Sequence, residues 1–127
     1  MHSNLAGRTI LIVEDEPLIA MDIVDALKSA GASVTTTMSS QHALILVEHD
    51  GLDAAIIDHG LGDGDSGQLC AGLKERDIPF VVYSGFSKIE GVCAEAPLVK
   101  KPASPDVLIA TVEGLLAPSA TREGHSS

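Results

Sequence analysis

The chain has 127 residues, 45% of them apolar, and its formal net charge at pH 7 is −10. A chain of this length favours one domain with a single core. Eighteen acidic residues against eight Lys and Arg argue against binding to nucleic acids or anionic membranes, since both rely on basic side chains. With no stretch near the roughly 18 apolar residues of a membrane helix, we expect a cytoplasmic protein.

Apolar, β-branched runs alternate with helical patterns along the whole chain. The predicted strands cover 9–13, 32–36, 52–58, 79–83 and 98–100, and the clear helices cover 17–30, 39–50, 67–76 and 104–117. Residues 85–95 contain two glycines and no clean apolar stripe, so the helix expected there is short or irregular. This alternation predicts an α/β fold: a doubly wound parallel sheet of five strands with helices on both faces.

Polar side chains stand where these strands end. Glu14 and Asp15 follow the first strand, Asp58 closes the third, and Ser84 closes the fourth. Lys101 follows the fifth. Because the carboxyl ends of parallel strands share one edge of the sheet, we expect these side chains to meet there.

This set of side chains fits a divalent cation and a phosphoryl group. Glu14, Asp15, Asp58 and the Gly60 backbone carbonyl supply the hard oxygen ligands that Mg²⁺ prefers. Carboxylates accept phosphoryl groups as acyl phosphates, so Asp58 is the candidate phosphoacceptor.

A lysine and a hydroxyl would bind the remaining phosphoryl oxygens. Ser84 supplies the hydroxyl, and Lys100 and Lys101 compete for the lysine role. We favour Lys101 because Pro102 restricts it to an extended backbone. Pro102 is also a candidate for a cis peptide bond that would aim the lysine side chain.

In their order and spacing these residues resemble the receiver domain of two-component response regulators. The resemblance covers residues 7–117, implies the flavodoxin-like strand order 2-1-3-4-5, and leaves 118–127 as a disordered tail. It implies Mg²⁺-dependent phosphorylation of Asp58 by a sensor histidine kinase or a histidine phosphotransfer protein. The chain would then act on a downstream protein target, as a stand-alone switch or phosphate relay without a DNA-binding output domain. Such a phosphoacceptor catalyses only its own phosphorylation and dephosphorylation.

Two departures from the usual receiver pattern stand out. Leu98 occupies the position, three residues before the lysine, where receivers carry a switching aromatic ring. The segment between Ser84 and Lys101 is also short. Together with Tyr83-Ser84-Gly85-Phe86, these departures are similar to an alphaproteobacterial subgroup nicknamed FAT GUY, after its Phe-Ala-Thr-Gly-aromatic motif.

Two other functions remain alternatives. One is a phosphorylation-independent pseudo-receiver that serves as a binding surface. The other is a phosphohydrolase with an Asp nucleophile, which would typically carry a second Asp where this chain has Gly60. Cys70 and Cys93 lack a metal-binding spacing, and we expect both to be free, buried or half-buried thiols.

Overall fold

The computed structural model describes residues 5–49, 51–59, 67–85, 91–101 and 103–116. It contains a five-stranded parallel sheet in the order β2-β1-β3-β4-β5. The strands are β1 (Thr9–Val13), β2 (Ser33–Thr37), β3 (Ala54–Asp58), β4 (Phe80–Ser84) and β5 (Leu98–Lys100). The α-helices are α1 (Pro17–Ser29), α2 (Ser40–His49), α3 (Gly67–Glu75) and α4 (Pro105–Leu116). The predicted fold class and strand order are confirmed.

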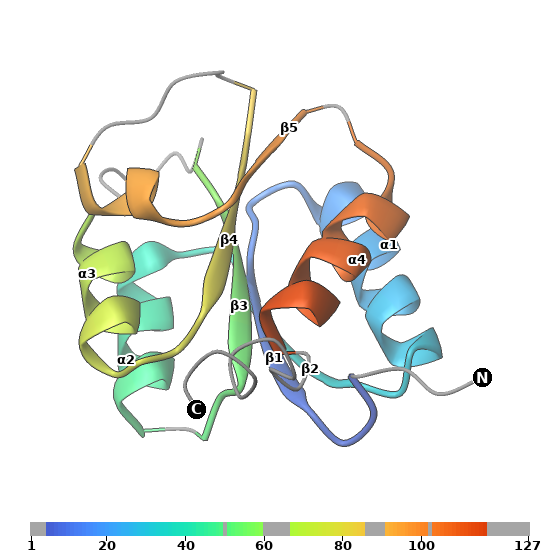
Figure 1. Ribbon diagram of the computed structural model, residues 1–127, viewed down its shortest axis with the longest axis horizontal. Coiled ribbons are helices and arrows are strands. Elements are labelled where there is room, and N and C mark those ends of the chain that lie inside the picture. The colour runs from blue at the N-terminus through green and yellow to red at the C-terminus, as the bar shows by residue number, and fades with distance from the viewer. Residues whose placement is uncertain (1–4, 50, 60–66, 86–90, 102, 117–127) are drawn as a thin grey trace, which may run out of the picture.

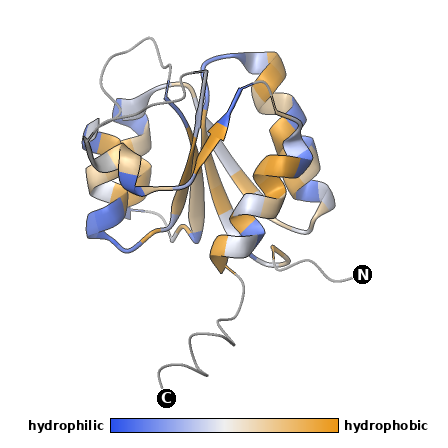
Figure 2. Cartoon of the chain, turned by 45° about the horizontal axis from the view of Figure 1, so that its top comes forward, coloured by the Kyte–Doolittle hydropathy of each residue, from blue (hydrophilic) through white to orange (hydrophobic). Residues whose placement is uncertain are grey.

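Helices cover both faces of the sheet (Figure 1), with α2 and α3 on one side and α1 and α4 on the other. The strands between them are largely apolar (Figure 2), as expected for a sheet that is buried on both faces. Successive side chains of each strand point to opposite faces, which divides the core into two clusters. The α2/α3 cluster includes Leu11, Val13, Ile57, Phe80 and Val82. The α1/α4 cluster includes Ile10, Ile12, Ile56, Val81 and Tyr83.

Local signals fix several helix ends. Pro17 begins α1, where its fixed φ suits the first turn. Gly31 follows that helix with a φ of 95°, and an added Cβ would lie 3.1 Å from the Ala6 Cα, so a glycine is required there. The Ser39 hydroxyl accepts a hydrogen bond from the His42 amide (3.2 Å) and caps α2.

Among the described residues between β4 and β5, which exclude 86–90, the chain forms a 3-10 helix, η1 (Gly91–Glu95), and no α-helix. This agrees with the irregular element expected there. η1 lies against α3, and Lys74 of α3 forms an ion pair with Glu95 of η1.

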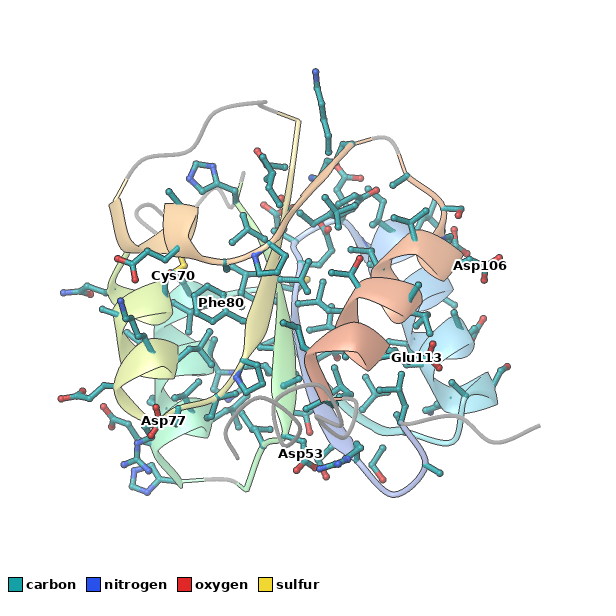
Figure 3. The ribbon with its side chains drawn as sticks, viewed as in Figure 1. Asp53, Cys70, Asp77, Phe80, Asp106 and Glu113 are labelled. Carbon is teal, nitrogen blue, oxygen red and sulfur yellow. A yellow bond between two sulfur atoms is a disulfide. The ribbon has the colours of Figure 1, made fainter. Side chains whose placement is uncertain are left out.

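The expectation that Cys70 and Cys93 are free thiols was wrong. They form a disulfide between α3 and η1, with a Cα–Cα distance of 5.3 Å (Figure 3). Both residues are buried, as expected. The sequence did not show the pairing because the cysteines are 23 residues apart, and only the packing of η1 against α3 brings them together.

Candidate functional site

Side chains from three strand ends converge at the carboxyl edge of the sheet, which is at the top of Figure 1. Lys101 Nζ donates a hydrogen bond to Asp58 Oδ1 at 2.8 Å. Asp58 is 3% exposed at the end of β3. One carboxylate oxygen each from Glu14, Asp15 and Asp58 lie within 4.8 Å of one another.

The backbone places these groups. The Lys101 amide donates to the Ser84 carbonyl (2.7 Å), which carries the β4–β5 pairing one residue beyond β5. The Glu14 amide donates to the Thr37 carbonyl (3.0 Å) and holds the end of β1 against β2. Ser84 is fully buried at the end of β4. Lys100 is exposed, whereas Lys101 is half-buried and contacts Asp58.

Glu14 is a buried acid with an altered pKa. Burial, together with the neighbouring Asp58 carboxyl, raises the pKa of Glu14 from 4.5 to about 8. Its Oε2 accepts a hydrogen bond from the Glu16 amide (3.0 Å). Its Oε1 is buried and has no hydrogen-bond partner in the part of the chain that the structure describes. A buried carboxylate oxygen of this kind fits a cation ligand.

Lys101 neutralises part of this negative charge. Partial burial alone would lower the pKa of Lys101, but the hydrogen bond and the charge of Asp58, and then the charge of Glu14, raise that pKa above 10.5. The lysine is therefore a fixed cation beside two carboxyl groups.

Two predicted site groups, the Gly60 carbonyl and Pro102, lie outside the described residues, as does the predicted tail at 118–127. Leu98 is 38% exposed and pairs in register with Val82, whose side chain belongs to the α2/α3 cluster. Lys101 follows Val99 by two residues and therefore lies on the α1/α4 face with it. Leu98 is thus on the other face of the sheet from the lysine.

One contact at this edge was not predicted. The Lys101 ammonium lies over the Tyr83 ring, 5.0 Å from its centroid. The sequence showed Tyr83 only as an apolar strand residue next to Ser84. The signal that could have indicated the contact is the strand register, which sets Tyr83 opposite Asp58.

The structure thus combines a doubly wound parallel sheet with two acids, a buried aspartate and a lysine at its carboxyl edge. The family model for the response regulator receiver domain matches residues 10–113. The chain therefore belongs to the response regulator receiver domain family, whose members are signalling proteins of two-component systems.

Two solved structures are similar to this chain in sequence and fold. The chain is 38% identical to SdrG from Pseudomonas melonis Fr1, solved in its BeF3-activated conformation, with a TM-score of 0.73 over 88% of this chain and 98% of that one. The receiver domain of a sensor histidine kinase from Pseudomonas aeruginosa PAO1 is 24% identical, with a TM-score of 0.76 over 89% of this chain and all of that one. That structure has a magnesium ion coordinated in its active-site cleft, and the similarity at this identity shows the fold alone.

A curated relative matches only in part. The transcriptional regulatory protein TcrA of Mycobacterium tuberculosis is 32% identical over 75 residues. This alignment covers 59% of this chain and 30% of TcrA, so the chain spans less than a third of that protein.

Proposed function

We propose that this chain accepts a phosphoryl group on Asp58 from a phosphohistidine of a sensor histidine kinase or a histidine phosphotransfer protein. The observation that carries the proposal is the contact between Lys101 Nζ and Asp58 Oδ1 (2.8 Å) at a carboxylate that is only 3% exposed. An ion pair at the rim of a buried sheet gives the nucleophile a fixed position and places a cation beside it.

The transfer is a single displacement at phosphorus. A carboxylate oxygen of Asp58 forms the new P–O bond as the P–N bond to the donor imidazole breaks, and the electron pair stays on the imidazole nitrogen. Lys101 then binds a phosphoryl oxygen and balances its charge. Ser84, at the end of the neighbouring strand, donates its hydroxyl to another phosphoryl oxygen.

The acid cluster fits Mg²⁺ as a cofactor. Glu14, Asp15 and Asp58 offer three carboxylate oxygens close together, and the orphaned Oε1 of Glu14 adds a buried ligand without another partner among the described residues. The Gly60 carbonyl remains our proposed fourth protein ligand. When bound, the ion supplies positive charge that stabilises the oxygens of the transferring group.

We further propose that the domain comprises residues 7–117, works in the cytoplasm, and passes its signal to a protein target as a switch or phosphate relay. Support comes from the match to the receiver domain family and from the 38% identity to SdrG, which was solved in a BeF3-activated conformation. No helix in the described part of the chain has both the length and the apolar character needed to cross a bilayer.

The test uses the phosphoryl mimic beryllofluoride with Mg²⁺ and an ¹⁵N-labelled protein. We expect shifts in the amide resonances of Asp58, Ser84 and Lys101, and none in Asp58→Asn, which keeps the size of the side chain. Phosphotransfer from a phosphorylated histidine kinase should label the wild-type protein and leave Asp58→Asn unlabelled. Unchanged spectra and no labelling would contradict the proposal and favour a phosphorylation-independent binding module. Turnover of a small phosphate monoester would instead indicate a phosphohydrolase.

A further inference from the structure

Tyr83 and Lys101 lie on the same face of the sheet because of the strand register. Tyr83 of β4 pairs with Asp58 of β3 on one side and with Val99 of β5 on the other. Paired residues of neighbouring strands project to the same face. Lys101 follows Val99 by two residues and also projects there, so its side chain must pass over Tyr83 to reach Asp58.

The contact between them has the geometry of a cation–π interaction. The Lys101 Nζ is 5.0 Å from the centroid of the Tyr83 ring, within the roughly 6 Å over which a ring attracts an ammonium group. Tyr83 is 6% exposed and the Lys101 side chain is 25% exposed, so the contact is only partly open to water. The same ammonium is 2.8 Å from Asp58 Oδ1. The lysine is thus held from two sides.

Tyr83 also contacts the chain beyond the lysine. Its hydroxyl donates a long hydrogen bond (3.4 Å) to the carbonyl of Ala103, two residues after Lys101. Its backbone carbonyl accepts a hydrogen bond from the His59 amide (3.0 Å), next to Asp58. One residue therefore contacts both chain segments that carry the interacting pair.

We propose that Tyr83 is the positioning residue for the phosphoryl-binding lysine: its ring supports the Lys101 ammonium above Asp58, and its hydroxyl anchors the following chain at Ala103. This inference rests on the proposed function, because it gives Lys101 its role toward the phosphoryl group. An aromatic side chain on β4 thereby acts on the lysine from the face opposite to Leu98.

The ring contact can be measured without any phosphoryl chemistry. The chain has five lysines, and selective ¹³C labelling at Cε makes each ε-methylene visible by NMR. The Lys101 ε-methylene should resonate upfield of those of Lys28, Lys74 and Lys100 because of the ring current of Tyr83. Tyr83→Phe should keep this shift, and Tyr83→Leu should abolish it. A Lys101 signal that coincides with the other lysines in the wild-type protein would overturn the proposal, even if no variant could be purified.

The functional readout is the apparent affinity for beryllofluoride in the presence of Mg²⁺. A cation–π contact of this kind predicts about threefold to thirtyfold weaker binding in Tyr83→Leu, and Tyr83→Phe should recover most of the loss.

Leu108→Ala is the matched control, because Leu108 is 1% exposed in the same core cluster and lines the same cavity of about 90 Å³ as Tyr83. It should lose stability yet keep both the upfield shift and the affinity. Equal weakening in Leu108→Ala and Tyr83→Leu would mean that Tyr83 acts only as a core residue and would refute the proposal. If beryllofluoride with Mg²⁺ does not bind to the wild-type protein, the proposed function is refuted. The upfield shift of Lys101 would still decide whether Tyr83 holds the lysine.

Discussion

Lys101 follows β5 and reaches Asp58 at the end of β3, so their 2.8 Å contact spans the whole width of β4. One ion pair therefore links the end of β3 to the residue after β5, across the end of β4. The pair also offsets the repulsion between Asp58 and the other acids of the site, since Glu14 and Asp15 supply carboxylate oxygens within 4.8 Å.

Replacing Lys101 should make the repulsion between the carboxylates measurable as a loss of stability. We expect Lys101→Met to lower the free energy of unfolding of the metal-free protein at pH 8 by about 1–3 kcal/mol, because a buried carboxylate is left without its cation. This is less than for a fully buried pair, since the Lys101 side chain is 25% exposed. Urea unfolding gives the value. Adding Asp58→Asn should restore most of the loss, and a double variant as unstable as the single one would contradict this explanation.

The raised pKa of Glu14 predicts a pH dependence of stability. Between its ordinary pKa of 4.5 and its folded pKa of about 8, Glu14 holds a proton in the folded protein and loses it in the unfolded chain. This group therefore stabilises the metal-free fold at low pH, and its contribution is lost as the pH rises through about 8. Urea unfolding from pH 5 to pH 8.5 should show a smaller decline in Glu14→Gln than in the wild-type protein. Parallel curves would refute the prediction.

Binding of Mg²⁺ should compete with this proton. A metal ligand must be deprotonated, so the ion has to displace the Glu14 proton at any pH below about 8. We expect the Mg²⁺ affinity to rise with pH up to about that value and then level off. Calorimetry at pH 6.5 in two buffers of different ionisation enthalpy should detect proton release. Glu14→Gln should bind Mg²⁺ more weakly and release no proton from this position.

The disulfide should contribute substantially to stability. In the chain-entropy treatment, a crosslink between residues 23 apart is worth about 3 kcal/mol. Urea unfolding with and without dithiothreitol should show this difference in the wild-type protein. The double variant Cys70→Ala/Cys93→Ala removes both sulfurs without burying a hydroxyl, and its stability should not respond to the reductant. A wild-type protein that is equally stable under both conditions would contradict the pairing.

Leu98 should have little influence on the site. Its side chain is 38% exposed and lies on the opposite face of the sheet from Lys101. We expect Leu98→Ala to change the beryllofluoride affinity by less than about twofold and to cost less than about 1 kcal/mol of stability. A large loss of affinity would show that this position retains a switching role without an aromatic ring.

The sequence predicted the sheet well because most of its strands are short and strongly apolar and are followed by or end in polar residues. The bounds of β1 and β5 match the expected ranges, and the other strands and the α-helices shift by two residues or fewer at each end. The convergence of Glu14, Asp15, Asp58 and Lys101 followed from one rule, that parallel strands bring their carboxyl ends together.

The sequence failed where the structure depends on packing between distant elements. The pairing of Cys70 with Cys93 depends on how η1 lies against α3, and an irregular segment of five residues has no periodicity that would fix its orientation. The contact of Tyr83 with Lys101 required the register of two strand pairs and the path of a long side chain. Neither the orientation of η1 nor the register of the strands can be predicted from the composition of a short segment.

The crosslink makes the two sides of the sheet unequal. On one side a covalent bond joins α3 to η1, halfway along the connection from Ser84 to Lys101. On the other side α1 and α4 pack through apolar contacts around Tyr83, in the part of the chain that the structure describes. If Lys101 moves when the site is occupied, helices held only by apolar contacts can shift more easily than elements joined by a covalent bond. We therefore expect a conformational change at the site to move α1 and α4, while α3 and η1 keep their positions.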